Sequence, residues 1–505
     1  MTTAVETLMS TPPVTCRADT TLNQATSTMD ERQIGSLVVT DERAMVGILT
    51  ERDLLRAAAA GVDPRTESVR AWMTADPDVL GLHDEVGVAW SGLTHHHYRH
   101  LPVVDHGDLV GVVSMRDLLT VAQIRPVDEV SADAPRGLEG VVVAQTAVGD
   151  VRGEEGFFHY RQYSAVDLAA TRSLEDVWQL LFDGALPDRA GAARFAGEVA
   201  ALRTVPDGLA ALLPALASVG APLEGLRSAV SILGAELGWR PSLDIGPEEL
   251  RHQALQLCSV VPTILAGLFR LAGGEDPIPP RSDLSTAANY LWMLSGREAP
   301  DAHVRAIEQY LVLTIDHGFN PSTFTARVIA STGADLAAAI GGAIGALSGP
   351  LHGGAPSRAL AMLDDIGTPD RAEAWLRDGV IRGDRIMGFG HRVYKTDDPR
   401  SVFLRQVARS LGGDLVEFAE EVERTAVDVL ADLKPGRQLY TNVEFFAGVV
   451  MHTCGIPRAM FTPTFASSRS IGWATHIMEQ AGDNRLIRPA ARYVGPPPPQ
   501  PVPQG

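Results

Sequence analysis

One stretch of the chain combines residue types that suit an anionic carbonyl substrate. The run Gly388-Phe389-Gly390-His391 is followed closely by Asp398-Pro399-Arg400. Glycine adopts backbone conformations that other residues avoid, and proline restrains the arginine that follows it. A histidine can polarise a carbonyl group while an arginine binds a carboxylate. The alternative is a structural turn with a hydrogen-bonded histidine, and only partners elsewhere in the chain distinguish the two.

Three further polar segments interrupt the apolar sequence around this stretch. Burying such groups costs free energy unless they are paired. Their repeated position at the ends of predicted helices therefore indicates a cleft between helices. The segments are Asp316 to Thr323, which contains His317; Gly349 to Ala355, which contains His352; and Thr441 to Phe445, which contains Glu444 and is followed by Arg469 and Arg488.

The elements that must position these residues are mostly helices. A short β-rich lead-in ends near Tyr163, and Ser173 with Asp176 forms a capping box before a helix that Gly184 ends. Helical apolar spacing then recurs with few alternating segments. The predicted helices span 189–204, 209–219, 222–237, 248–272, 283–295, 301–314 and 370–382.

The first third of the chain is an internal repeat. Met9 recurs as Met73, and the run that begins at Gly47 recurs at Gly111, both with an offset of 64 residues. A register without gaps over a whole unit is a strong repeat signal. Each unit reads as an entry strand, a helix, two strands and a closing helix. In the first unit the helix spans 21–30 and the strands span 36–40 and 45–49.

This repeat resembles a pair of CBS domains. The resemblance implies that an adenine nucleotide binds at two strand-to-helix turns, through Thr50 and Asp53 in one and Ser114 and Asp117 in the other. A hydroxyl and a carboxylate there can bind ribose, and backbone N–H groups can face phosphate. The alternative is plain helix capping by the same residues. The sequence does not select a nucleotide.

The remainder resembles citrate synthase, from about Leu138 to Gly495. Several long motifs stand in the family's order. They are His317-Gly-Phe-Asn-Pro-Ser-Thr-Phe-Thr-Ala-Arg, Gly349-Pro-Leu-His-Gly-Gly-Ala, Gly388-Phe-Gly-His-Arg-Val-Tyr-Lys with Asp398-Pro-Arg, Asn442-Val-Glu-Phe, and Arg469-Ser-Ile-Gly-Trp.

The resemblance implies a role for each reacting group. His352 would stabilise the enolate of acetyl-CoA, and His391 would protonate the keto oxygen of oxaloacetate. Glu444 would remove the methyl proton as general base. Arg400 and Arg469 would bind the oxaloacetate carboxylates. A small domain, about 363–465, should close on the large one and exclude water.

The resemblance also implies partners. Arg488 matches an arginine that enters the site of the neighbouring subunit, so we expect a homodimer or a higher oligomer. His317 would line the oxaloacetate pocket. Gly388, Phe389, Gly390 and Lys395 lie where the family seats coenzyme A. The expected enzyme needs no metal and no tightly bound cofactor, and its CoA thioester is a substrate.

Some positions depart from the family's usual pattern. Glu444 stands for an aspartate, and its extra methylene moves the carboxylate by roughly one ångström. Thr314 stands for a second histidine, Gln162 for a glycine, and Pro356-Ser357 for Asn-Glu. Two alternatives stay open: a 2-methylcitrate synthase that uses propionyl-CoA, and a catalytically weak scaffold that senses nucleotides.

Composition narrows the class of protein. The net charge of -19 over 505 residues argues against nucleic-acid binding. Three dispersed cysteines, the absence of a signal peptide and of a long uncharged apolar run predict a cytoplasmic protein without a membrane span. His95-His96-His97 reads as a solvated surface run, because consecutive side chains point in different directions.

The predicted organisation follows from these segments. We expect a multidomain chain: an α/β CBS pair followed by a mostly α-helical citrate synthase fold. The predicted parts are a CBS module at 1–123 (repeats at about 5–58 and 69–122), a linker at 124–136, the citrate synthase domain at 137–495 and a proline-rich disordered tail at 496–505.

Overall fold

The chain forms two compact units, which we describe separately. One comprises Met1–Val141 with Ala490–Gly505, and the other comprises Val142–Pro489. A computed structural model describes residues 5–32, 34–41, 44–84, 98, 100–114, 117, 136–138, 140–350, 352–353, 355–390, 394, 396–436, 439–491, 493–496 and 498–499. The histidine run and almost all of the predicted linker lie outside these residues.

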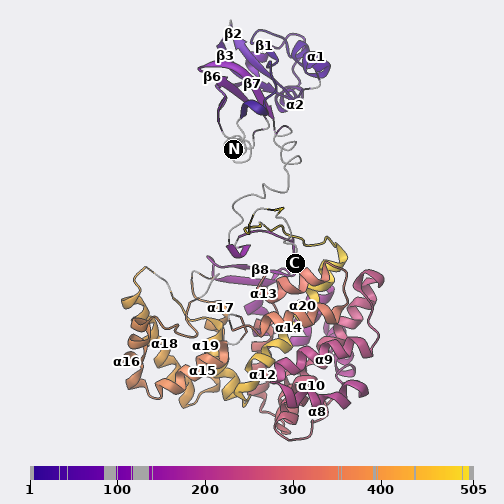
Figure 1. Cartoon of the computed structure of the whole chain (residues 1–505), viewed down its shortest axis with the longest axis vertical. Helices are drawn as coiled ribbons and strands as arrows, with labels where there is room; N and C mark the ends of the chain where they lie inside the picture. Colours follow the sequence, from indigo (N-terminus) through magenta and orange to yellow (C-terminus); the bar gives the residue numbers. More distant parts are fainter. Residues whose placement is uncertain are drawn as a thin grey trace, which may run out of the picture. The chain divides into compact units, whose positions relative to one another are not determined.

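The first unit contains two small sheets that repeat each other (Figure 1). In each sheet a short strand pairs in parallel with a longer one, which pairs antiparallel with a third. The strands are β1 (Thr15–Arg17), β2 (Ser36–Asp41), β3 (Ala44–Thr50) and β4 (Thr74–Ala75) in one sheet, and β5 (Leu80–Gly81), β6 (His100–Asp105) and β7 (Asp108–Ser114) in the other.

The repeat register is visible in the strands themselves. Adding 64 to the bounds of β2 and β3 gives those of β6 and β7. Even the irregularity between Val39 and Thr40 recurs between Val103 and Val104. Helices α1 (Leu22–Arg32) and α2 (Glu51–Ala59) cover the first repeat. The α/β repeat expected from the sequence is therefore confirmed in its strands, although both predicted helices of the second repeat, from Asp84 and after Ser114, lie mainly outside the described residues.

The entry segment of each repeat crosses to the other repeat. Thr74 in β4 pairs with Ile48 in β3. At the equivalent position, Ser10 forms a bridge with Val112 in β7. Each repeat therefore supplies one wall of a site whose other wall belongs to its companion.

The second unit begins with a small antiparallel sheet and continues as helices. The sheet contains β8 (Gly149–Arg152), β9 (Phe157–Tyr160) and β10 (Tyr163–Ser164). The helices are α5 (Ala165–Thr171), α6 (Leu174–Asp183), α7 (Arg189–Ala201), α8 (Asp207–Val219), α9 (Pro222–Glu236), α10 (Pro247–Ala272), α11 (Thr286–Ser295), α12 (Asp301–Thr314), α13 (Pro321–Ala330), α14 (Leu336–Leu347), α15 (Ala355–Ile366), α16 (Pro369–Arg382), α17 (Pro399–Leu411), α18 (Asp414–Leu433), α19 (Val443–Thr453) and α20 (Phe461–Gly482). Short 3-10 helices lie at η1 (Val5–Thr7), η2 (Val69–Ala71), η4 (Arg136–Leu138), η5 (Ser242–Asp244) and η6 (Arg458–Met460).

Local signals set most of these helix ends. The Ser173 hydroxyl accepts the Asp176 N–H at 3.1 Å, and Gly184 ends α6 at a φ of 82°, as the sequence predicts. Two predicted boundaries were wrong by three residues: α7 ends at Ala201 rather than at 204, and the start of α11 also differs. Helix α11 starts at Thr286 rather than at 283, because Ser285 caps it by accepting the Ala288 N–H.

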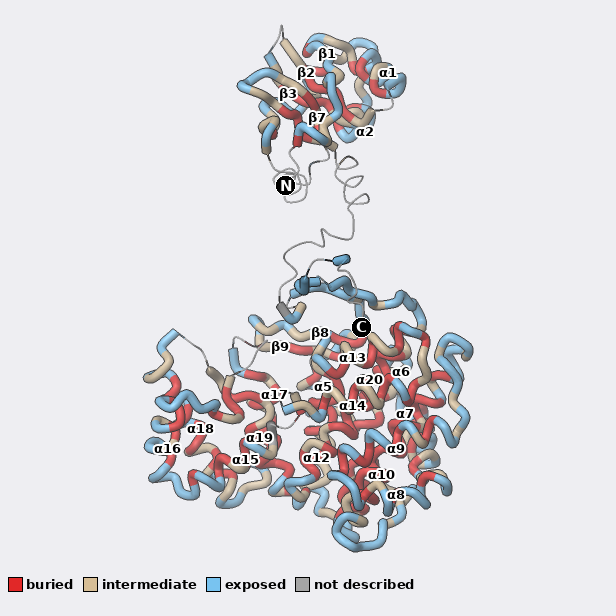
Figure 2. Tube along the Cα trace, in the orientation of Figure 1, coloured by how far each residue is buried: buried red, intermediate tan, exposed pale blue. Residues whose placement is uncertain are grey.

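One hydrophobic core runs through the second unit. Figure 2 shows its buried segments in α10, α12, α14 and α20. Helix α10 is long and apolar enough to cross a membrane, and it is the one such helix among the described residues. However, 78% of its most apolar window is buried inside the fold, as expected of a core helix.

Helix α12 lies at the centre of the contacts that matter for the site. It packs against α17, α19 and α20. Helices α15 to α19 gather on one side of this unit, and α8, α9, α10 and α14 on the other (Figure 1). The polar segments singled out in the sequence lie after the ends of α12 and α14 and at the starts of α13, α15, α17 and α19.

Candidate active site

The glycine-containing loop is held by backbone bonds to the start of α19. Gly388 and Gly390 have φ values of 85° and 82°, in the region that favours glycine. The Asn442 N–H donates to the Gly388 oxygen at 2.8 Å, and the Asn442 side-chain amide donates to the Gly390 oxygen at 3.0 Å. Phe389 is buried against Phe445, with ring centroids 5.3 Å apart. His391 and Lys395 lie outside the described residues.

Glu444 stands in the first turn of α19, directly beyond this loop. The Asn442 side chain caps the helix by accepting the Glu444 N–H at 3.1 Å. Burial raises the pKa of Glu444 to about 7, although the positive charges of Arg400 and Arg385 oppose the shift. A carboxyl group with a pKa near neutrality is suited to accept a proton at physiological pH.

Arg400 is buried and fixed by its neighbour Asp398. Its Nε and Nη2 donate to the two carboxylate oxygens at 3.0 and 2.8 Å. Asp398 also accepts the Val443 N–H at 3.1 Å, which ties the start of α17 to the start of α19. The guanidinium lies against the rings of Phe158 and Tyr394. Its position is therefore set before any ligand arrives.

His317 belongs to the same cluster. Its Nε2 lies 3.0 Å from the Tyr394 hydroxyl oxygen. Its ring also contacts the rings of Phe158 and Tyr394, with centroids 5.8 and 5.5 Å away. Because the same two aromatic residues contact Arg400, the structure brings His317 and Arg400 to one place, as the sequence predicts.

Arg469 lies in the middle of α20 and is also buried. Its Nε donates to the backbone oxygen of Thr314 at 2.9 Å, and its guanidinium lies 4.6 Å from the centre of the Phe465 ring. Burial lowers the pKa of Arg469, while Asp316 opposes the shift. Thr314, which replaces a family histidine, bonds to the helix backbone of α12 and to Ser468. It is thus a packed structural residue.

His352 is held by a serine that the sequence reasoning did not single out. The Ser322 hydroxyl oxygen lies 2.8 Å from His352 Nε2, and it accepts the indole N–H of Trp473 at 3.1 Å. Burial, and then the charge of Arg469, lower the pKa of His352 to about 4, so the imidazole is neutral at physiological pH. Ser322 and Trp473 both belong to motifs that the sequence analysis identified. Only the fold shows that Ser322 contacts His352 and Trp473.

Two buried tyrosines show that these groups share one region. The charges of Arg469, Glu444 and Arg400 all act on Tyr310 in α12, whose pKa burial raises. Burial likewise raises the pKa of Tyr160 in β9, and the charges of Arg469 and Arg400 oppose this shift. The Tyr160 hydroxyl donates to the backbone oxygen of Asp316 at 3.2 Å.

A second buried network lies behind the His317 loop. His476 Nε2 lies 3.2 Å from the Asp316 carboxylate, and its Nδ1 faces Arg327 at 3.2 Å. Arg327 also donates to Glu479, whose carboxylate accepts the Ala147 N–H at 2.7 Å. The histidine-bonded Asp316 accepts the N–H of Gly318, so this network holds the turn after α12. Sequence reasoning missed it, because its members stand far apart.

Arg488 is the predicted site residue that a single chain leaves outside the cluster. It is exposed, in the segment that follows α20. It forms no hydrogen bond or ion pair with the residues that the structure describes. Among those residues, no group of three His, Cys, Asp or Glu side chains is arranged to hold a metal ion.

The two predicted nucleotide turns share one local geometry. The Asp53 carboxylate accepts the backbone N–H and the hydroxyl of Thr50 at 2.8 and 2.7 Å. Asp117 accepts the same two groups of Ser114 at the same distances. These bonds form a capping box at the start of α2, whereas the residues directly after Ser114, except Asp117, lie outside the described part of the chain. Helix capping by these residues does not exclude a bound nucleotide.

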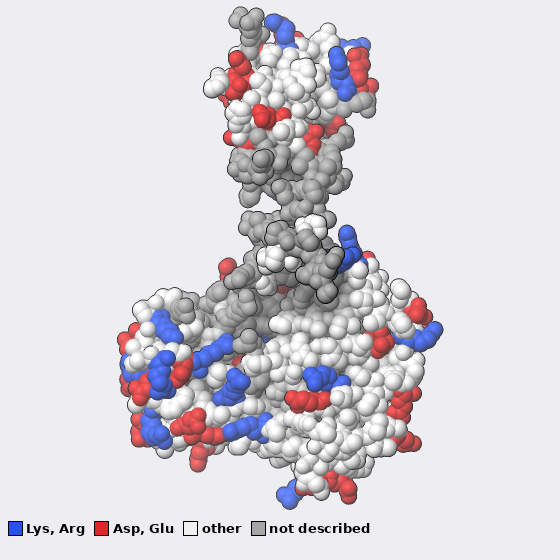
Figure 3. Space-filling model, in the orientation of Figure 1, with Lys and Arg blue, Asp and Glu red and all other residues white. Residues whose placement is uncertain are grey.

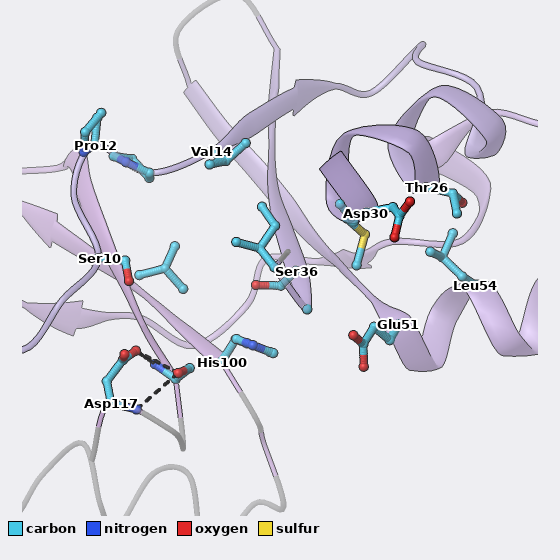
Figure 4. A pocket seen from close by; sticks show the side chains of 16 residues that line it. Ser10, Pro12, Val14, Thr26, Asp30, Ser36, Glu51, Leu54, His100 and Asp117 are labelled. Atoms are coloured by element: carbon cyan, nitrogen blue, oxygen red, sulfur yellow. Dashed lines mark hydrogen bonds between the residues drawn. The ribbon is translucent and has the colours of Figure 1, made fainter. Parts of the chain in front are cut away.

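Each turn also borders a cavity. The Asp53 cavity has a volume of about 310 Å³. The Asp117 cavity has a volume of about 760 Å³ (Figure 4). Each cavity combines the turn of one repeat with the entry segment of the other. The Asp117 cavity is lined by Ser10, Pro12, Pro13, Val14, Thr26, Met29, Asp30, Ile34, Gly35, Ser36, Glu51, Leu54, His100, Val112, Ser114 and Asp117. The Asp53 cavity is lined by Gly35, Ile48, Thr50, Glu51, Arg52, Asp53, Arg56, Thr74, Asp76, Pro77, Asp78, Tyr98, His100 and Leu101.

Comparison with known proteins assigns each part of the chain to a protein family. Residues 137–490 match the family model for the C-terminal domain of citrate synthase, and residues 5–60 and 69–123 each match that of the CBS domain. A citrate synthase of Acidithiobacillus ferridurans is 39% identical over 71% of this chain and 95% of its own length. A 2-methylcitrate synthase of Mycobacterium tuberculosis is 39% identical over 74% of this chain and 94% of its own length.

Solved structures agree. The citrate synthase of Thermotoga maritima matches with a TM-score of 0.65 and 36% identity, over 73% of this chain and 98% of its own. That of Thermoplasma acidophilum, solved with carboxymethyl coenzyme A and oxaloacetate, matches with a TM-score of 0.68 and 30% identity, over the same shares. The chain therefore belongs to the citrate synthase family, and it is an acyltransferase-type enzyme that carries a pair of CBS domains before its catalytic fold.

Proposed function

We propose that the protein condenses acetyl-CoA with oxaloacetate and water to give citrate and coenzyme A. One observation carries this proposal: two titratable groups near the buried arginines have pKa values shifted in opposite directions. The pKa of Glu444 is raised to about 7, and that of His352 is lowered to about 4. Such a pair supplies a base and a neutral hydrogen-bond donor at the same pH.

In the first step, Glu444 removes a proton from the acetyl methyl group, and the negative charge moves to the thioester oxygen. The neutral His352 stabilises that oxygen through its Nδ1–H. This tautomer requires the Ser322 hydroxyl, which accepts the Trp473 N–H, to donate its proton to His352 Nε2 and not to the Asn320 side-chain oxygen, which also lies 2.8 Å from it. The Asn320 oxygen, the other acceptor near Ser322, already receives two backbone N–H groups.

In the second step, the enolate carbon attacks the keto carbon of oxaloacetate. Arg400 and Arg469 bind the substrate carboxylates and orient the carbonyl, and His317 lines the pocket. The new carbon–carbon bond leaves charge on the former keto oxygen, which takes its proton from His391. Water then hydrolyses the thioester of citryl-CoA and releases coenzyme A.

The experiment is to mix the purified protein with acetyl-CoA and oxaloacetate and to follow free CoA thiol. We expect turnover that His391→Ala and Glu444→Gln each reduce at least a hundredfold. The absence of thiol release from the wild type at any substrate concentration would reject the proposal. It would favour the alternative that the chain is a nucleotide-sensing scaffold.

A second candidate reaction uses propionyl-CoA and gives 2-methylcitrate. It is favoured by one finding: the 2-methylcitrate synthase relative is as similar, at 39% identity, as the first citrate synthase relative. The same groups would act, since only one methyl group is added beside the reacting carbon. The ratio of kcat/KM for the two acyl-CoA substrates decides between the two reactions.

Three finer features belong to this proposal. An adenine nucleotide binds the CBS pair and alters the enzyme's rate, which requires different affinities in two states of the enzyme. The enzyme works in the cytoplasm as a homodimer or higher oligomer, with Arg488 contributed across the subunit boundary. It holds no tightly bound cofactor and requires neither nucleic acid nor membrane. Figure 3 is consistent with this, since acidic and basic side chains mix over the visible described surface.

A further inference from the structure

The Asp117 cavity and the Asp53 cavity are related by the repeat, but their walls differ. The positions equivalent to Pro12 and Val14 in the first cavity are Asp76 and Asp78 in the second. In the Asp117 cavity the wall is apolar, and Pro12 and Val14 lie on the same side of it in Figure 4. Apolar walls suit the faces of a planar base. In the Asp53 cavity two carboxylates occupy this wall, and they would lose hydration if a base covered them.

Among the described residues, the two aspartates also differ in their partners. Arg56 donates to Asp53 Oδ1 at 2.7 Å, while Thr50 occupies Oδ2. Both carboxylate oxygens of Asp53 are therefore engaged. The position equivalent to Arg56 in the second repeat is Thr120, which cannot form such an ion pair. A ribose diol needs free acceptor positions on a carboxylate, so the Arg56 contact competes with it.

The ion pair by itself is weak, because the Arg56 side chain is 59% exposed. The difference in cavity volume also favours the Asp117 cavity. A volume of 310 Å³ is at the lower end of the range for small-molecule sites, whereas 760 Å³ is well inside that range. The apolar wall, the lack of an equivalent of Arg56 and the larger volume therefore all favour nucleotide binding in the Asp117 cavity.

We infer that the CBS pair binds one nucleotide per chain, with its base beside Pro12 and Val14 and its ribose on Ser114 and Asp117. The Asp53 turn is then a helix cap without a ligand. Among the described lining residues, the Asp117 cavity holds three carboxylates and no lysine or arginine. The phosphates of the nucleotide therefore point away from these residues. This inference rests on the proposed nucleotide role and narrows it to one of two sites.

The test is isothermal titration of the full chain with AMP and, separately, with ATP. We expect a stoichiometry of one per chain for the nucleotide that binds. Asp117→Ala should weaken binding at least tenfold. Asp53→Ala is the matched variant, because it removes the same capping bonds from the equivalent turn, and it should leave affinity within about twofold. A loss of binding through cap damage alone would appear in both variants.

A second pair of variants tests the cavity without touching either cap. Thr26 is exposed on α1 and lines the Asp117 cavity, whereas its neighbour Ser27 is exposed and lines neither cavity. Thr26→Trp should abolish binding by filling the space, and Ser27→Trp should not change it. Two nucleotides per chain, or loss of binding in Asp53→Ala only, would overturn the inference and leave the nucleotide role intact. No binding of either nucleotide would reject both, while condensation activity is measured independently.

Discussion

At the scale of single residues, the chemistry depends on where two ordinary side chains are buried. Glu444 and His352 each lose hydration in the fold, and loss of hydration disfavours the charged form of both. For the carboxyl group this raises the pKa, and for the imidazole it lowers the pKa. Nearby arginines oppose the first shift and reinforce the second. The replacement of the family's aspartate by glutamate therefore still gives a group that titrates near neutral pH.

We predict that kcat/KM for the acyl-CoA substrate falls about tenfold per pH unit well below pH 7, because the base must be ionised to act. Steady-state rates between pH 5.5 and 8.5 measure this. Glu444→Gln should remove the acid limb together with most of the activity, by about 10²- to 10⁴-fold. Glu444→Asp keeps a carboxylate, so its kcat/KM should still fall at low pH. A wild-type kcat/KM that stays constant down to the acid end of this range would contradict the burial argument.

The same shift has a consequence for stability. The pKa of Glu444 in the folded state, about 7, lies above its ordinary value of 4.5. Folding therefore favours the protonated form, and this contribution is complete below pH 4.5 and is lost as the pH rises through 7. Thermal melts should show that Glu444→Gln gains more over the wild type at pH 8 than at pH 5.

The Ser322 hydroxyl gives a second prediction at this scale. Ser322→Ala should lower kcat about tenfold to a hundredfold, because His352 loses the partner that fixes its orientation and tautomer. The KM for oxaloacetate should change little. Trp473→Phe is the control: it removes only the donor to Ser322 and should affect kcat less. Equal losses in both variants would mean that Ser322 supports the fold and not the catalytic histidine.

At the scale of elements, the site is assembled from helix ends. The loop at Gly388–Gly390 is tied by backbone bonds to the start of α19, and Asp398 ties the start of α17 to the same place. Helix α12 packs against these two helices and against α20, which carries Arg469. Helices α17 and α19 therefore contribute their first turns to this region, and α20 contributes its middle. Small displacements of any of them would misplace a reacting group.

We predict that Gly388→Ala damages both stability and activity. Its φ is 85°, and a Cβ there would lie 2.9 Å from Phe445 Cβ, in the core. Strained backbone costs about 1 kcal/mol, and the overpacked core adds about 1–3 kcal/mol. Gly383→Ala is the matched control, since Gly383 also has a φ of 85° but nothing within 4 Å. It should cost only the backbone strain and leave kcat unchanged. Chemical denaturation and thiol-release rates measure both quantities.

At the scale of the whole molecule, the chain consists of two units with separate cores. Such chains commonly unfold in more than one step. We predict two calorimetric transitions. Nucleotide at about 100 times its dissociation constant should stabilise the CBS unit by about 2.7 kcal/mol, and oxaloacetate should stabilise the other unit. A single transition that either ligand shifts equally would show that the units unfold together.

The sequence by itself determined what depends on local spacing and on residue type. It predicted the 64-residue repeat, the capping box at Ser173, the left-handed glycines at 388 and 390, and the order of the family's motifs. These features rest on the conformational preferences of a few neighbouring residues. The resemblance to the family's motifs also named His317, Arg400, Arg469, His352 and Glu444, because each stands in a motif that is defined by residue type and order alone.

Only the tertiary structure decided what depends on burial and on charges brought from far along the chain. The pKa values of Glu444 and His352, the contact of Ser322 with His352, and the network from Asp316 to Glu479 all join segments that the sequence separates. The difference between the two CBS cavities also depends on the tertiary structure, because each cavity is lined by residues of both repeats. Solvation and through-space charge follow distance in the fold and not distance in the sequence.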